Sequence, residues 1–280
     1  MDASLFRQKK LFPRHVMEKM STIRVDYKEK NALIDQSRRE GSNHLKAAVV
    51  LLMNYKKQNG HSEYVFQLIK RSQKVTQGGD IGCPGGMLHP RQDRFLSSLL
   101  KKGVLPLTGG RVIRKIKKED SETSSLIGLF LTTALREAWE EIGLNPLNIK
   151  FLGALPSYSL TMFARTIFPL VCVTRRPFAY RLSSEVEKIL EIPVSLFFNS
   201  ENYAMLDVET SLGKNTEPFH YQTPCLVIPN PNGEEDILWG ATFNIIHNFL
   251  RVISDNSLPE VSASRIKNKV LTIHYLSPKG

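Results

Sequence analysis

Short strand patterns and longer helix patterns alternate along this chain. Residues 47–54 form a continuous apolar run with β-branched side chains, and residues 64–70 alternate between apolar and polar side chains. Both patterns predict β-strands. A polar turn with Asn59 and Gly60 lies between the two segments, so we expect two strands in hairpin order.

Two segments have the apolar spacing of amphipathic helices. In the first, apolar side chains recur every three or four residues up to Ile142, Thr123 or Ser124 provides a cap, and Gly143 follows as a stop. The second, residues 239–253, predicts a helix near the C-terminus. We expect additional strands at residues 168–174 and 225–228 and another helix at residues 184–190.

The interleaving of strands and helices predicts the α/β fold class, with a mixed β-sheet between helices. We divide the chain into an N-terminal helical arm (residues 1–43), a domain (44–255) and a C-terminal tail (256–280). Within the domain, residues 88–122 are basic and interrupted by Pro and Gly. We interpret them as a basic insertion before the helix that ends at Gly143.

The composition is that of a globular chain with one sizeable core, because 41% of the 280 residues are hydrophobic. The longest apolar runs, residues 47–53 and 126–131, are much shorter than the roughly 20 residues that cross a bilayer. We therefore exclude a transmembrane protein and expect no membrane partner. No secretory signal is visible at the N-terminus. The three cysteines lack a C-x-x-C spacing, which favours a reducing compartment, the cytoplasm or alternatively an organellar matrix.

The chain carries an excess of positive charge. It has 38 Lys and Arg residues against 27 Asp and Glu residues, a formal net charge of +11. This field attracts phosphates and other anions, but cations spread over the whole chain are more typical of solubility than of nucleic-acid binding. Only residues 111–118, with five cations, form a local patch. We expect a small anionic ligand and no nucleic-acid partner.

Three glutamates gather at the end of the helix that Gly143 stops. Glu137 and Glu141 are four residues apart and share one face, and Glu140 lies on nearly the same face. Like charges at a helix C-terminus repel one another and the helix dipole, so a cation should compensate them. Mg²⁺ or Mn²⁺ suits carboxylate oxygens. The alternative is an acidic, exposed helix end that pairs with lysines from elsewhere.

A glycine-rich loop precedes this helix. Residues 78–86 contain five glycines, among them the pair Gly85 and Gly86 directly after Pro84. Such a segment cannot form a regular element, and it allows the backbone to approach a ligand closely.

The segment from Arg136 to Leu144 resembles the end of the signature of the Nudix hydrolase family, Arg-Glu-apolar-x-Glu-Glu-x-Gly-apolar, at every defined position. The resemblance implies a Nudix-type α/β/α sandwich and a metal-dependent attack of water on a nucleoside diphosphate linked to another group. It implies Glu137 and Glu141 as principal metal ligands, with Glu140 assisting and Arg136 holding the glutamates. A backbone carbonyl of the glycine pair, Gly85 or Gly86, would also bind the metal.

The first half of the signature departs from the family. There, a Gly and a Glu precede the Arg by fourteen and eight residues, whereas here Gly86 lies fifty residues before Arg136 and Gly128 occupies the Glu position. The extra length coincides with the basic insertion. The missing carboxylate has three candidates, Glu119, Asp120 and Glu122.

The loop before the glycine pair is similar to a motif of the coenzyme A diphosphatase branch of this family. Residues 68–72, which end in Arg71 and Ser72, lead through the glycine-rich loop to the Pro-Gly-Gly turn. This likeness implies hydrolysis of coenzyme A or acyl-coenzyme A. Coenzyme A carries several phosphates, so its binding needs cations. The candidate substrate-binding residues are Arg71, Lys70, Lys74 and Gly85, and Glu185 or Glu187 is a candidate general base.

Two alternatives remain beside this hypothesis. The chain could hydrolyse another nucleotide derivative, such as a dinucleotide cofactor or a nucleoside triphosphate. It could also be a non-catalytic Nudix-fold regulator that binds a ligand or nucleic acid. The three intact glutamates argue against the regulator.

Overall fold

The computed structural model describes residues 3–58, 60–101, 111–160, 163–211, 219–230, 232–261, 265–272 and 275. The residues cluster by their contacts into two compact units. We call residues 2–64 and 83–181 the α5 unit, after helix α5 (Ser121–Ile142). Residues 65–82 and 182–280 form the β10 unit, named after strand β10 (Phe219–Pro229).

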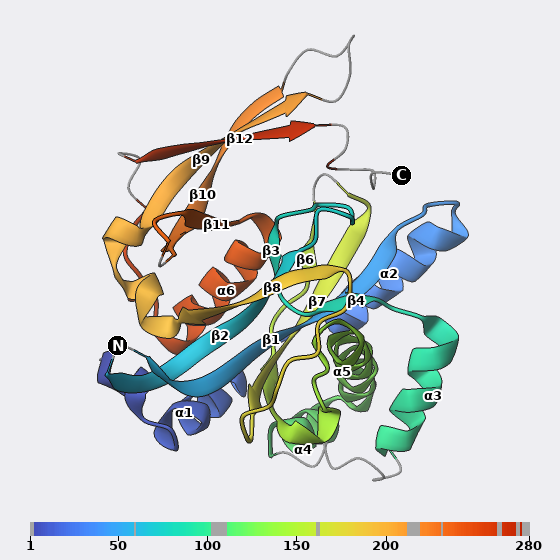
Figure 1. Ribbon diagram of the computed structural model, residues 1–280. Helices are drawn as coiled ribbons and strands as arrows, with labels where there is room; N and C mark the ends of the chain where they lie inside the picture. Colours follow the sequence, from blue (N-terminus) through green and yellow to red (C-terminus); the bar gives the residue numbers. More distant parts are fainter. Residues whose placement is uncertain are drawn as a thin grey trace. The chain divides into compact units, whose positions relative to one another are not determined.

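The α5 unit contains a mixed sheet (Figure 1). Strand β1 (Leu45–Gln58) pairs in parallel with β7 (Arg165–Thr174) and antiparallel with β4 (Gly85–Met87). Strands β5 (Ile149–Ala154) and β6 (Tyr158–Ser159) pair antiparallel with β7. The predicted α/β class with a mixed sheet is therefore confirmed.

Helix α5 packs against β1, β4 and β7, and the other helices of this unit surround it or the sheet. Its Phe130 ring stacks on Phe168 of β7, with ring centroids 3.8 Å apart, and Tyr27 meets both rings edge-on. The residues predicted as an N-terminal arm thus supply core side chains to this unit. The helices are α1 (Leu11–Met20), α2 (Tyr27–Arg39), α3 (Pro90–Lys101) and α4 (Arg111–Glu119), with the 3-10 turns Ala3–Arg7 and Pro146–Asn148.

Local signals in the sequence determine both ends of α5. Asp120, rather than Thr123 or Ser124, is its N-cap, and the Asp120 carboxylate accepts hydrogen bonds from the backbone N–H groups of Glu122 and Thr123. Gly143 ends the helix with a φ of 73°, a left-handed conformation that glycine adopts without a steric penalty. The predicted stop is confirmed, and the start lies earlier than expected.

The β10 unit contains two sets of paired strands (Figure 1). Strand β2 (His61–Arg71), whose first residues belong to the α5 unit, pairs antiparallel with β3 (Ile81–Gly82) and β8 (Val186–Pro193). A second sheet has the order β11-β10-β9-β12, and helix α6 (Gly240–Ile253) packs against β10 and β11. Its other strands are β9 (Tyr203–Ser211), β11 (Glu235–Trp239) and β12 (Ile266–Thr272), and 3-10 turns span Val194–Phe198 and Ser200–Asn202.

One expectation fails in the β10 unit, and the segment that we named the C-terminal tail contains a regular element. The helix predicted at residues 184–190 is wrong, because most of this segment lies in strand β8, where pairing with β2 overrides the local pattern. The predicted C-terminal tail contains a regular strand, β12, which pairs in parallel with β9. A seven-residue strand at a sheet edge depends on its partner, so its own sequence predicts it poorly.

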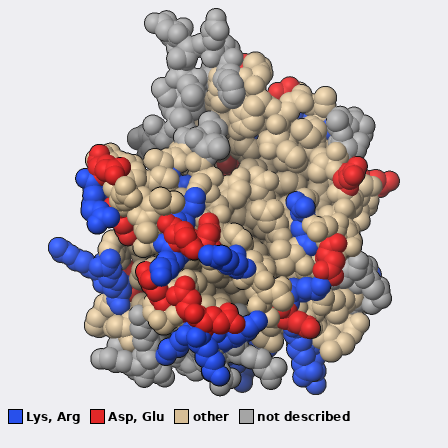
Figure 2. Space-filling view, turned by 180° about the vertical axis from the view of Figure 1, so that it is seen from behind, with Lys and Arg blue, Asp and Glu red and all other residues tan. Residues whose placement is uncertain are grey.

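No helix in the described part of the chain is both long and apolar enough to cross a membrane. On the face shown in Figure 2, Lys and Arg side chains lie beside Asp and Glu side chains.

Candidate active site

The last turns of α5 lie against the Pro-Gly-Gly turn that begins β4. The backbone N–H of Gly85 donates a hydrogen bond of 2.9 Å to Glu141 Oε2. At Gly86, an added Cβ would lie 2.5 Å from the carboxyl carbon of Glu137. The structure therefore brings Gly85, Gly86, Glu137 and Glu141 together, although more than fifty residues separate the turn from the helix end. Gly86 is required because a side chain there would occupy the space of the Glu137 carboxylate, and Gly85 is required because a Cβ there would lie 2.3 Å from the carbonyl oxygen of Ala48.

Arg136 holds two of the three glutamates. Its Nη2 donates to Glu137 Oε1 at 3.0 Å and its Nη1 to Glu140 Oε2 at 3.1 Å. Nη2 also donates to the carbonyl oxygen of Met87 at 3.1 Å, which ties the helix to β4. The compensating cation that the helix end requires is thus supplied, at least for Glu137 and Glu140, by a side chain of the same helix.

Asp93 is a buried partner of Arg136 that the sequence reasoning missed. Its carboxylate accepts a hydrogen bond of 2.8 Å from Arg136 Nε and others from Thr133 Oγ1 and the His89 backbone N–H. The Asp93 side chain is fully buried. Burial lowers the pKa of Arg136, but the bonds to Asp93 and the charge of Glu137 outweigh it and raise that pKa overall. Arg136 is therefore a permanent cation.

We predicted Glu119, Asp120 or Glu122 as the replacement for the family Glu. None of these three residues forms a hydrogen bond or an ion pair with Arg136. Asp120 caps α5, Glu122 pairs with Lys28 at 2.8 Å, and Glu119 is exposed on α4. Asp93 follows Gly86 by seven residues, whereas the family spacing is six. This near-match was the available signal. The extra length thus separates Asp93 from Arg136 along the chain without separating them in space.

The carboxylates differ in their surroundings. Glu137 is 18% exposed and Glu140 is 51% exposed. Burial raises the pKa of Glu137 above its ordinary value, and the neighbouring Arg136 opposes this rise. Glu141 is buried and accepts the Gly85 amide hydrogen bond described above. A divalent cation beside these groups would favour their charged forms.

The donor set fits a hard divalent cation. Carboxylate oxygens from one helix face and backbone oxygens of the glycine turn are the ligand types that Mg²⁺ and Mn²⁺ prefer. The space at Gly86, which a Cβ would fill, keeps the Glu137 carboxylate beside the turn. Among the described residues, no three His, Cys, Asp or Glu side chains converge into a ready-made metal cluster. The carboxylates are instead held by Arg136 and the Gly85 amide.

The predicted substrate-binding residues Lys70, Arg71 and Lys74 belong to the β10 unit. Lys70 Nζ forms an ion pair of 2.9 Å with the buried Asp236, which also accepts a hydrogen bond from Lys188. Arg71 Nε donates to the Thr76 carbonyl oxygen at 3.0 Å. Lys74 is exposed on the loop. Lys70 thus has a structural partner, whereas Arg71 ends strand β2 directly before the loop and Lys74 lies on the loop.

Cys83 lies one residue before the Pro-Gly-Gly turn. Burial, with a smaller contribution from the charge of Glu141, raises the pKa of its thiol to about 12. The thiol is therefore protonated at neutral pH and does not act as a nucleophile.

The sequence is similar to two curated proteins. It is 29% identical over 127 residues to the uncharacterized Nudix hydrolase NudL of Pectobacterium atrosepticum, a match that covers 45% of this chain and 59% of that protein. It is 40% identical over 74 residues to the peroxisomal coenzyme A diphosphatase ndx-8 of Caenorhabditis elegans, covering 26% of this chain and 31% of that protein. The chain thus matches less than two thirds of the length of either relative. No family model matches it.

Solved structures with a distant likeness include a Caenorhabditis elegans Ap4A hydrolase binary complex, with a TM-score of 0.34 and 15% identity over 54% of this chain and 81% of that chain. A MutT/nudix family protein from Enterococcus faecalis has a TM-score of 0.41 and 11% identity over 82% of this chain and 72% of that chain.

Proposed function

We propose that this chain, which belongs to the Nudix hydrolase family, is a divalent-metal-dependent pyrophosphohydrolase that cleaves the diphosphate of coenzyme A or acyl-coenzyme A. One observation carries the reaction type. Glu137 and Glu141 end a helix directly against the Gly85-Gly86 turn, and Arg136 holds the neighbouring carboxylates. Anionic ligands and backbone oxygens of this kind suit a divalent cation that polarises a phosphoric anhydride and activates water for its hydrolysis.

Each side chain has a distinct part in the proposed mechanism. When bound, Mg²⁺ or Mn²⁺ supplies Lewis-acid polarisation of a phosphoryl oxygen and a lower pKa for the attacking water. Glu137 and Glu141 would be the principal metal ligands, and Glu140 would assist them. The Gly86 carbonyl oxygen would be a further ligand from the backbone. Arg136 keeps Glu137 and Glu140 oriented through its separate Nη donors. A glutamate accepts the proton of the attacking water, with Glu185 and Glu187 as candidates.

The substrate class rests on the segment that carries Arg71. The loop from Arg71 to the Pro-Gly-Gly turn is similar to that of the coenzyme A diphosphatase branch, and one curated relative is a coenzyme A diphosphatase. We assign the substrate's phosphates to Arg71 and Lys74, because Lys70 is engaged by Asp236. A guanidinium suits phosphate geometry, and a lysine supplies a point charge.

A panel assay tests this proposal. The purified chain is incubated with Mg²⁺ or Mn²⁺ and with coenzyme A, acyl-coenzyme A, dinucleotide cofactors or nucleoside triphosphates, and the products are separated. We expect metal-dependent release of 4′-phosphopantetheine and adenosine 3′,5′-bisphosphate from coenzyme A. Faster cleavage of a dinucleotide or triphosphate would reassign the substrate. Binding without turnover of any compound would contradict the enzyme and favour a regulator.

We also propose a reducing compartment for this chain, with the cytoplasm as first choice. The peroxisomal relative makes an organelle the specific alternative. Imaging of a tagged chain in its native cell distinguishes the two.

A further inference from the structure

The glycine-rich loop ends at Asp80, whose carboxylate collects donors from the last part of the chain. Trp239 Nε1 at the end of β11 donates to Oδ1 at 3.2 Å, and Lys269 Nζ of β12 donates to the same oxygen at 2.6 Å. The Tyr275 hydroxyl donates to Oδ2. The Asp80 side chain is only 16% exposed. We call Asp80, Trp239, Lys269 and Tyr275 the Asp80 clasp.

A hydrogen bond between backbone groups also joins the glycine-rich loop to the segment that contains Tyr275. The Gln77 N–H donates to the Tyr275 carbonyl oxygen at 2.8 Å, and the Gly79 N–H donates to the Arg71 carbonyl oxygen at 2.9 Å. Gln77 has a φ of 57°. A non-glycine residue in this left-handed region is disfavoured unless its surroundings hold it there. The clasp and the Tyr275 carbonyl supply that constraint.

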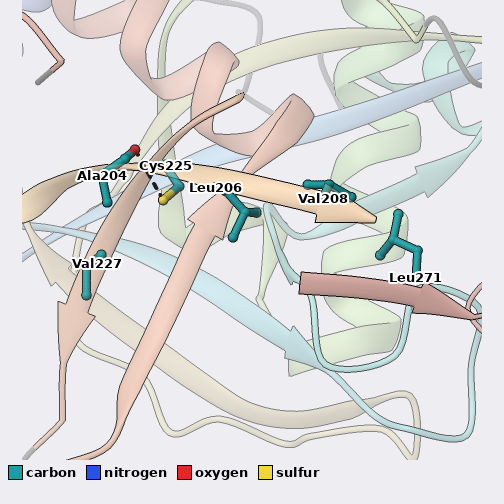
Figure 3. Close-up of a cluster of buried hydrophobic side chains, with 6 residues drawn as sticks. All are labelled: Ala204, Leu206, Val208, Cys225, Val227 and Leu271. Carbon is teal, nitrogen blue, oxygen red and sulfur yellow. Dashed lines mark hydrogen bonds between the residues drawn. The ribbon is translucent and has the colours of Figure 1, made fainter. Parts of the chain in front are cut away.

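Strand β12 is itself anchored in the core of its sheet. Leu271 is 2% exposed and belongs to a cluster with Leu206, Val208 and Cys225 from β9 and β10 (Figure 3). The Lys269 ammonium lies 5.1 Å from the centroid of the Trp239 ring and 5.9 Å from that of Tyr275. Because a lysine covers the face of Trp239, we interpret this ring as part of the clasp.

We propose that the Asp80 clasp is a positioning device for the loop of residues 72–79, so that the C-terminal strand determines the affinity for the phosphates of the substrate. The inference rests on the proposed function, because Arg71 and Lys74 are the phosphate contacts of that proposal. Lys269 and Tyr275 act through the loop. Without the clasp, the loop would become ordered only when substrate binds. The entropy cost of this ordering would weaken binding and raise KM. Because Glu137 and Glu141 belong to the α5 unit, kcat should not change.

The test uses the full chain with Lys269→Met and Tyr275→Phe. The matched control is Lys267→Met, because Lys267 lies on the same strand, has similar exposure (28% against 26%) and pairs with Glu235 rather than with the loop. With coenzyme A and Mg²⁺, we expect KM to rise about tenfold in the two clasp variants while kcat stays within about twofold. The control should match the wild type, and Lys269→Arg should restore much of the affinity.

A second readout does not depend on turnover. Without substrate, hydrogen exchange at the Gln77 amide should accelerate by roughly tenfold or more in both clasp variants and stay unchanged in the control. Unchanged exchange in both variants would overturn the clasp. Faster exchange with an unchanged KM would overturn its positioning role. If the wild type cleaves no coenzyme A, the proposed function fails, and exchange at Gln77 still decides whether the clasp orders the loop.

Discussion

Arg136 contributes one guanidinium to acceptors on two helices and one strand. It binds Asp93, Glu137 and Glu140 together with the carbonyl oxygen of Met87, and its side chain is 8% exposed. A lysine could not replace this planar fork, because its ammonium is a single point of charge. The orientation of Glu137 and Glu140 therefore depends on one hydrogen bond each from Arg136.

Removal of the charge from Glu137 or Glu141 should abolish the proposed activity. Glu137→Gln and Glu141→Gln each keep the shape of the side chain and delete one anionic ligand, so we expect nearly all turnover to disappear while the fold is retained. Metal-dependent initial rates and circular dichroism measure the two effects.

The control for both variants is Glu122→Gln, on the same helix but 61% exposed and paired with Lys28. It should retain full activity. Retention of more than about a tenth of the rate in both ligand variants would show that these glutamates do not bind a catalytic metal.

Gly86→Ala should displace the Glu137 carboxylate. The new Cβ would lie 2.5 Å from the Glu137 carboxyl carbon, at the end of a side chain that can rotate away. We therefore expect turnover to fall by tenfold or more, which corresponds to an activation free energy higher by roughly 1.4 kcal/mol. The free energy of unfolding should change little. Gly128→Ala is the comparison, because its Cβ would meet only Ser97 Oγ at 3.9 Å. A fully active Gly86→Ala variant would disprove the close approach.

At the scale of elements, α5 connects local sequence signals to the candidate site. Asp120 and Gly143 define its ends, and its apolar residues pack on β1 and β4. Helix α3 adds the buried Asp93. The described residues of the basic insertion therefore pack around α5. Position along the chain is therefore a poor guide to distance from the site.

Asp93→Asn should weaken the contact between α3 and α5. The substitution leaves the buried guanidinium of Arg136 without its closest anion, and removing one partner of a buried pair costs on the order of 3 kcal/mol. Urea denaturation should show this loss, and the proposed activity should fall with it because Arg136 also orients Glu137. Glu29→Gln breaks an exposed pair with Arg24 and should cost less than about 1 kcal/mol. Equal costs for the two variants would contradict the structural role of Asp93.

At the scale of the whole molecule, charge couples stability to pH. Asp236 is buried and accepts hydrogen bonds from Lys70, Lys188 and Asn230. Burial alone would raise the pKa of Asp236, but these bonds outweigh burial and hold that pKa below its ordinary value. A depressed folded-state pKa stabilises the fold above the unfolded pKa of about 3.9, and this stabilisation is lost as the pH falls through the lower folded-state pKa.

Asp236→Asn should therefore lower Tm at neutral pH. The difference from the wild type should persist down to about pH 4 and shrink below it, because wild-type Asp236 is then protonated as well. Thermal unfolding at a series of pH values measures the gap. A gap that stays constant between about pH 2 and pH 7 would show that the charge of Asp236 does not matter.

The sequence predicted those features that depend on neighbouring residues. Strands β1, β7 and β10, helices α5 and α6 and the stop at Gly143 follow from short-range periodicity and from the conformational freedom of glycine. The three glutamates were recognisable because the helical repeat places them on nearly one face, whereas the role of Arg136 followed from the resemblance to the Nudix signature.

Contacts between distant segments were decided only in the tertiary structure. Asp93 meets Arg136 across the basic insertion, β8 becomes a strand through pairing with β2, and Asp80 receives donors from Lys269 and Tyr275. Such contacts depend on which surfaces pack together and not on the spacing of residues within one element. Local periodicity carries no record of a partner that lies forty to two hundred residues away, whereas packing and hydrogen bonding act at a few ångströms regardless of that separation.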